Sequence, residues 1–134
     1  MKKILSMTLT TIMLFMCTLS VYAAEPMDIP QPYWNSIATI TNDLTVRNGV
    51  AEISVSVAAT SSVDYISVTS VLQKRSFFFF WSDEYTYDYS FNTYYGFFEK
   101  DVPNINSGTW RLKTTVRTYR NGTMLEEVTV YSED

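Results

Sequence analysis

The sequence of 134 residues contains no histidine and only one cysteine, Cys17, which lies in an apolar N-terminal stretch. Without histidine, the chain lacks the most common general base and the most common metal ligand. Without a second cysteine, it can form no intrachain disulfide and no cysteine-based zinc site. We therefore expect a protein that is not an enzyme and that has no catalytic residue, no metal ligand and no cofactor.

Carboxylates are the remaining candidates for acid–base or metal chemistry. A glycosidase needs two facing carboxylates, and a calcium loop needs alternating oxygen ligands with a turn glycine. The acids of the central region match neither pattern, so we interpret them as solvated charges of turns and strand rims. They are Asp83, Glu84, Asp88, Glu99 and Asp101.

The N-terminal segment has the pattern of a secretory signal peptide. Two lysines precede an apolar run over residues 4–22, and Val21 and Ala23 occupy the −3 and −1 positions of a signal-peptidase motif. We predict that residues 1–23 are removed and that the product is secreted, with association at the cell surface as an option. The alternative is an uncleaved signal that anchors the chain, since the run is about as long as a membrane helix requires.

The charge of the remaining chain narrows the choice of partners. Removal of residues 1–23 leaves 8 basic and 14 acidic residues, a net charge of −6. An acidic chain binds nucleic acid poorly, because neutralisation of phosphates supplies most of the non-specific affinity. We expect no nucleic-acid partner, and no membrane contact except through an uncleaved signal.

After the signal, the sequence predicts an extended lead-in over residues 24–34 and one all-β domain over residues 35–134. Three prolines favour an extended lead-in. Apolar and polar residues then alternate with a period of two, which is typical of half-buried strands, and no helical periodicity occurs. We expect about seven strands in a single antiparallel sandwich. The clearest inward-facing residues are Ala51, Ile53, Val55, Val57, Ile66, Val68, Ser70 and Leu72.

The C-terminal region predicts a hairpin. Residues 108–119 alternate and lead into an Asn-Gly pair at 121–122, a strong turn signal. A two-residue loop would place Val116 opposite Glu127, whereas a three-residue loop places it opposite Glu126 and gathers the later apolar residues on one face. We predict the three-residue loop. The basic residues of the other face predict either an anion-binding stripe or a solvated face with cross-strand charge pairs; they are Arg111, Lys113 and Arg117.

Residues 107–112 (Ser-Gly-Thr-Trp-Arg-Leu), followed by a long strand and a last hairpin strand, resemble the end region of immunoglobulin-like and fibronectin-III-like sandwiches. These folds usually have a corner tyrosine near this point, and Trp110 stands there in this chain. The segments 63–66 and 72–74, with Trp81, are also similar to a group of small secreted Gram-positive proteins of unknown function. The resemblance implies export and an immunoglobulin-like fold, and it implies no catalytic residue.

Aromatic residues are concentrated at 77–98, where 13 of 22 side chains are aromatic and none is Ile, Leu, Val or Met. The alternating segment 85–91 predicts a strand whose aromatic face points to the core. Its four inward-facing residues are Tyr85, Tyr87, Tyr89 and Phe91.

Five consecutive aromatic residues at 77–81 cannot all face one side of a strand. If Lys74 and Arg75 form the turn of a hairpin with an even-numbered loop, Phe78 and Phe80 face outward and the other three rings face the core. A three-residue loop inverts this assignment. The aromatic pairs at 94–95 and 97–98 each send one ring outward in the same way.

We predict an exposed binding surface that contains Phe78, Phe80, Tyr94 and Tyr95. The alternative is that the sheets curl and the lead-in around Trp34 covers the rings. An exposed surface favours a secreted recognition module for an extracellular ligand, with a glycan as the first candidate. The second hypothesis is an assembly protein whose aromatic strand pairs with a protein partner or with its own copy in a homo-oligomer.

Overall fold

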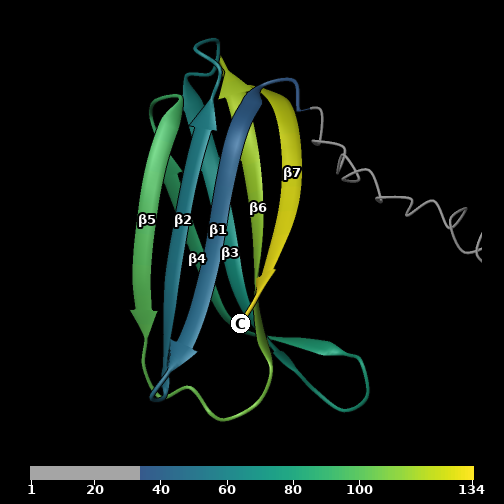
Figure 1. Ribbon diagram of the computed structural model, residues 1–134. Helices are drawn as coiled ribbons and strands as arrows, with labels where there is room; N and C mark the ends of the chain where they lie inside the picture. The colour runs from purple at the N-terminus through teal and green to yellow at the C-terminus, as the bar shows by residue number, and fades with distance from the viewer. Residues whose placement is uncertain (1–33) are drawn as a thin grey trace, which may run out of the picture. The chain divides into compact units, whose positions relative to one another are not determined.

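The computed structural model describes residues 34–134, in which seven β-strands occur and no helix. The strands are β1 (Ile37–Arg47), β2 (Val50–Ala59), β3 (Tyr65–Arg75), β4 (Trp81–Phe91), β5 (Tyr95–Val102), β6 (Trp110–Arg120) and β7 (Thr123–Glu133). They form a three-stranded sheet of order β1-β2-β5 and a four-stranded sheet of order β4-β3-β6-β7, packed face to face (Figure 1). The predicted all-β fold of about seven antiparallel strands is confirmed.

The predicted signal peptide, residues 1–23, lies outside the described residues, as does the lead-in up to residue 33. Within residues 34–134, no helix is long and apolar enough to cross a membrane. The described part of the lead-in is short, and it continues into β1 at Ile37.

Short aliphatic side chains fill the space between the two sheets. Alternate residues of β2, β3 and β6 point inward, as the period-two pattern predicts, and Ile53, Ile66 and Leu112 are almost fully buried. Within the described chain, Trp110 is the one aromatic residue among the buried hydrophobic side chains. Most of the aromatic residues at 77–98 are therefore not core residues.

A chain of hydrogen-bonded side chains crosses the core between the sheets. Asn42 of β1 accepts a hydrogen bond from Thr114 Oγ1 at 2.7 Å, and the Thr114 hydroxyl also contacts that of Ser70 at 2.9 Å. Ser70 in turn contacts the Tyr89 hydroxyl at 3.0 Å. Burial raises the pKa of Tyr89 to about 12, and the bond with Ser70 offsets only part of this effect. This series of hydrogen-bonded side chains links both sheets, and its buried polar atoms all have hydrogen-bond partners.

The register of the β6–β7 hairpin differs from the registers that a two-residue loop and a three-residue loop predict. A two-residue turn at 121–122 closes the hairpin, but Leu125 is an extra residue in β7, so that Val116 pairs with Val128. A β-bulge of this kind shifts every later pair by one position. The predicted three-residue loop is wrong, because the bulge and not the loop length brings the valines together.

Glu126, which follows the bulge, binds the start of β1. Its carboxylate accepts hydrogen bonds from the backbone N–H groups of Asn35, Ser36 and Ile37 and from the Ser36 hydroxyl, at 2.8–3.2 Å. Burial acts to raise the pKa of Glu126, but these hydrogen bonds outweigh it and hold the pKa below its ordinary value. The carboxylate therefore ties the first described residues to β7.

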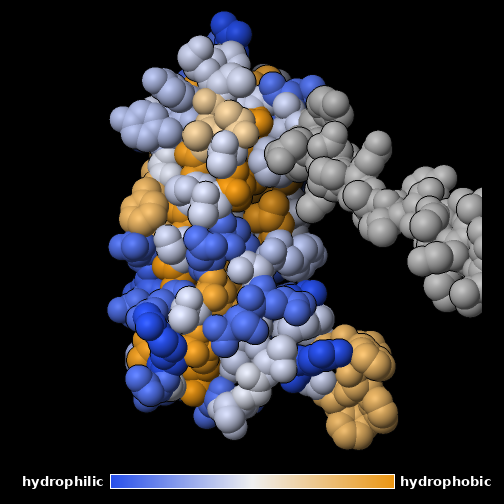
Figure 2. All heavy atoms as spheres, in the orientation of Figure 1, coloured by the Kyte–Doolittle hydropathy of each residue, from blue (hydrophilic) through white to orange (hydrophobic). Residues whose placement is uncertain are grey.

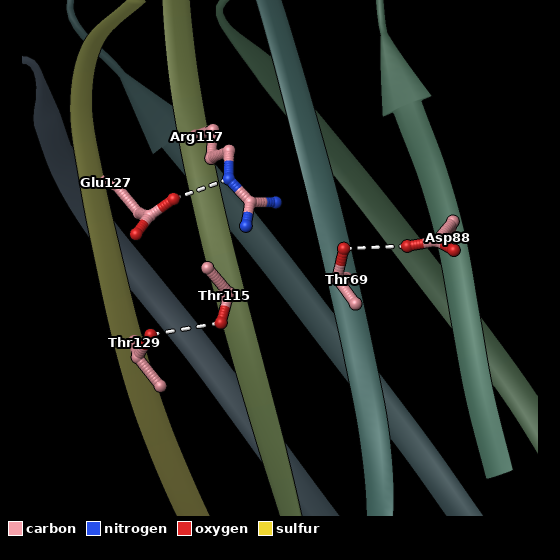
Figure 3. A network of polar contacts seen from close by, with 6 residues as sticks. All are labelled: Thr69, Asp88, Thr115, Arg117, Glu127 and Thr129. Carbon is pink, nitrogen blue, oxygen red and sulfur yellow. Dashed lines mark hydrogen bonds and ion pairs between the residues drawn. The ribbon is translucent and has the colours of Figure 1, made fainter.

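The outer face of the four-stranded sheet carries polar pairs across neighbouring strands (Figure 3). Arg117 of β6 forms an ion pair with Glu127 of β7, and the Thr69 hydroxyl of β3 donates to Asp88 of β4 at 2.7 Å. Arg117 thus takes part in a cross-strand charge pair, as the alternative of a solvated face predicts.

We expect Glu126→Ala to lower the free energy of unfolding by about 2–3 kcal/mol near pH 7, because three backbone N–H groups lose a charged acceptor. The folded-state pKa of Glu126 lies below its ordinary 4.5, so its contribution is present above pH 4.5 and is lost as the pH falls through the folded-state value. Urea unfolding of wild type and variant at neutral and acidic pH measures both effects.

The neighbouring substitution Glu127→Ala is the control, since it removes only the exposed ion pair with Arg117. It should cost no more than about 1 kcal/mol. Equal losses in the two variants would contradict the structural role of Glu126.

Candidate functional site

The loop between β3 and β4, residues 76–80, contains four of the five consecutive aromatic residues, and we call it the phenylalanine loop. β3 continues to Arg75, which pairs with Trp81 at the start of β4. Lys74 and Arg75 therefore do not form the turn, and residues 77–80 belong to no strand, so neither of the loop lengths considered for a turn at Lys74 and Arg75 applies. Both residues pair within the sheet instead, and the chain turns only after them.

All four rings of the phenylalanine loop are exposed, by 70–81% of their surface. The loop lies at the end of the β3–β4 hairpin, which projects beyond the rest of the sandwich (Figure 1). In the space-filling view, the end of this hairpin is a separate apolar cluster (Figure 2). Soluble monomers seldom expose a contiguous apolar patch that has no binding role.

The loop backbone adopts a conformation that phenylalanine does not favour. Phe78 has a φ of 68°, in the left-handed region, which costs a non-glycine residue about 1–2 kcal/mol. The other non-glycine residues with positive φ between residues 34 and 134 are asparagines, namely Asn48, Asn104 and Asn121. Turn stability therefore does not explain a phenylalanine at position 78. Strain of this kind is typical of functional positions.

Cations and aromatic rings form the base of the loop. The guanidinium of Arg75 lies 5.2 Å from the ring centroid of Phe79. The guanidinium of Arg111 lies between the rings of Trp81 and Tyr131, at 4.2 and 4.6 Å from their centroids. This stack joins β4, β6 and β7 beside the loop and stabilises its attachment. The sequence does not predict the stack, because the three residues lie on different strands and meet only in the final register.

A second aromatic cluster lies where the edge strands β4 and β5 face each other from different sheets. We call Tyr87, Tyr89, Phe91 and Phe98 the aromatic seam. The rings of Tyr89 and Phe98 stack in parallel, with centroids 3.8 Å apart. All four side chains pack half-buried against the core, as the alternation of 85–91 predicts for three of them. Tyr85 is exposed, so its predicted core position is wrong.

The four predicted site residues are all exposed, but they do not form one surface. Phe78 and Phe80 belong to the phenylalanine loop at one end of β4, whereas Tyr94 and Tyr95 follow its other end. β4 has 11 residues and therefore spans roughly 35 Å. The structure thus separates two aromatic surfaces that sequence analysis treated as one.

Tyr95 and Phe97, which we call the platform, project from β5 on the outer face of the three-stranded sheet and are exposed by 61% and 56%. They border an open groove whose lining includes Thr39, Ser56 and Ala58 of β1 and β2. Phe97 is not among the predicted site residues, although alternation correctly predicts that one ring of the pair at 97–98 points outward.

The lead-in does not cover either aromatic surface in the described part of the chain. Residues 35–37 bind Glu126 of β7, which lies at the edge of the four-stranded sheet opposite β4. Trp34 packs against the core. The alternative in which the segment around Trp34 shields the exposed rings therefore has no support from residues 34–37.

The central acids are divided between the outer faces of the two sheets. Asp83 and Asp88 accept hydrogen bonds from neighbouring residues of β3, whereas Glu99 and Asp101 lie on β5, in the other sheet. Among residues 34–134, no group of three or more His, Cys, Asp or Glu residues is close enough to hold a metal ion. The structure does not bring the acids into one site.

Comparison of the chain with protein-family models, with curated proteins and with solved structures found no match. A functional assignment therefore depends on the physical properties of the surfaces described above. Of these, the phenylalanine loop combines the most exposed rings with a strained backbone.

We expect Phe78→Asn to raise the free energy of unfolding by up to about 1 kcal/mol, because asparagine adopts a positive φ at lower cost than phenylalanine. Urea unfolding measures the change. Phe80→Asn is the matched control, since Phe80 is equally exposed but has no positive φ, and it should leave stability unchanged. A loss of stability in Phe78→Asn would show that this ring supports the fold.

Proposed function

We propose that this chain is a secreted, non-enzymatic recognition module that binds an apolar acceptor through the phenylalanine loop. The observation that carries the proposal is the exposure of four consecutive phenylalanine rings at the end of a projecting hairpin. The aliphatic core does not need these rings. An acceptor that buries them gains about 1.5–3 kcal/mol for each ring that is fully removed from water.

The scaffold that we propose for this loop is an immunoglobulin-like sandwich of the fibronectin-III type. The division of seven strands into sheets of three and four supports it. Further support comes from Trp110, whose Nε1–H donates to the carbonyl of Asn106 at 2.9 Å. The corner tyrosine of these folds makes a comparable bond to the backbone a few residues upstream. A rigid sandwich of this kind presents binding residues on its end loops.

We expect Phe78→Ser/Phe80→Ser to elute much earlier than wild type from a phenyl-agarose column in a falling salt gradient, because half of the loop's rings are lost. Its thermal unfolding temperature should stay close to that of wild type, since the loop contributes nothing to the core. The full chain, purified after export and cellular processing, is the material for both measurements.

The matched control is Met124→Ser/Leu125→Ser, which removes two exposed apolar residues from the hairpin at the opposite end of the sandwich. It should shift the elution far less than the loop variant. Unchanged elution of the loop variant would contradict the proposed function, and a large loss of thermal stability would show that the rings belong to the core.

The platform supports a glycan as a second candidate ligand. Sugar rings stack on flat aromatic surfaces, and the groove beside Tyr95 and Phe97 supplies the hydroxyl groups of Thr39 and Ser56. We expect Tyr95→Ala/Phe97→Ala to abolish any binding of N-acetylglucosamine oligomers in calorimetric titrations. Phe78→Ser/Phe80→Ser is the control and should bind as wild type does. If neither the wild type nor either variant binds these oligomers, this glycan is eliminated as a candidate ligand.

A further inference from the structure

We infer that the acceptor of the phenylalanine loop is the interfacial region of a phospholipid bilayer. This inference rests on the proposed function, because it names the acceptor of the same loop. It also replaces the expectation that only an uncleaved signal contacts a membrane. That expectation rested on the net charge of −6, which opposes contact with an anionic surface but does not oppose burial of the exposed rings of this loop in uncharged lipid.

The orientation of the rings favours a fluid acceptor over a folded protein. The rings of Phe77 and Phe78 meet at an interplanar angle of 78°, and Phe79 lies against Arg75. The loop therefore presents several differently directed edges and not one flat face. A protein pocket must match such a shape closely, whereas acyl chains rearrange around rings in any orientation.

The residues next to the rings are those that occur at a membrane surface. Trp81 follows the loop directly, and tryptophan is enriched at the boundary between headgroups and acyl chains. Arg75 precedes the loop, is exposed and takes part in neither of the ion pairs found within residues 34–134. Its guanidinium matches the geometry of a lipid phosphate. Insertion of the rings would bring both side chains to the headgroup level.

The backbone of the loop limits how deeply it can insert. The N–H of Ser76 donates to the carbonyl of Phe80 at 2.8 Å, but residues 77–79 take part in no strand pairing. Unpaired backbone groups are costly in the hydrocarbon core, where no water can satisfy them. The loop therefore reaches the upper acyl region, as an anchor that lies in one leaflet and does not span the bilayer.

The charge of the molecule selects the type of lipid. Asp83 and Glu84 lie close to the loop in β4, and the chain without residues 1–23 has a net charge of −6. A strongly anionic surface repels such a protein. Burial of the rings, with Arg75 as the adjacent cation, is therefore the driving force, and zwitterionic lipid is the preferred surface.

The test is sedimentation of the full, processed chain with phosphatidylcholine vesicles and with vesicles that also contain phosphatidylglycerol. We expect wild type to bind phosphatidylcholine at least as well as the anionic mixture, and Phe78→Ser/Phe80→Ser to bind at least tenfold more weakly. Met124→Ser/Leu125→Ser should bind as wild type does. All variants share the same N-terminus, so the differences report on the loop.

Two further results would overturn the inference. Vesicle binding that is absent, or equal in wild type and the loop variant, would show that the loop does not enter a bilayer. If the loop variant still elutes earlier from phenyl-agarose, the proposed function stands and only the acceptor is wrong. Oligomers that form without lipid and are abolished by Phe78→Ser/Phe80→Ser would identify a second copy of the chain as the acceptor instead.

Discussion

The packing of short aliphatic side chains between the two sheets is the constraint on which the rest of this structure depends. Residues 34–134 contain no cysteine, so burial must hold the sheets together without a disulfide. The central strands β2, β3 and β6 supply this core, and facing sheets lie only about 10 Å apart. Valine, isoleucine and leucine fill most of that space, and Trp110 is the one aromatic residue among the buried hydrophobic side chains of residues 34–134.

The two open sides of the sandwich are closed by different physical means. On the side of β1 and β7, the carboxylate of Glu126 collects the backbone N–H groups at the start of β1. On the side of β4 and β5, the aromatic seam stacks Tyr89 on Phe98, and Phe91 covers Gly96, where a Cβ would lie 2.2 Å from the ring. The seam accounts for four of the aromatic residues at 77–98, so those rings have a structural role.

Alternation in the sequence was sufficient to predict the inward faces of β2 and β3, because a strand must bury every second residue of a two-layer sandwich, but in β4 it wrongly placed Tyr85 in the core. It could not predict the bulges at Leu125 and Glu84, because a single extra residue leaves no signal in composition and changes every later pair. It also could not place the turn after β3. Phe78 occupies a position with positive φ, where turn chemistry predicts asparagine or glycine, so the local signal was absent.

The position of the phenylalanine loop separates binding from folding. Neither the core nor the two closed sides of the sandwich use its rings. The free energy gained when binding removes these rings from water is therefore not offset by a loss of contacts in the core. Such a loop would also promote association between copies of the chain, but the net charge of −6 that remains without residues 1–23 opposes it by mutual repulsion. Because copies of this acidic chain repel one another, the exposed rings stay available for an acceptor. The same repulsion does not act on an uncharged apolar surface, which can therefore serve as the acceptor.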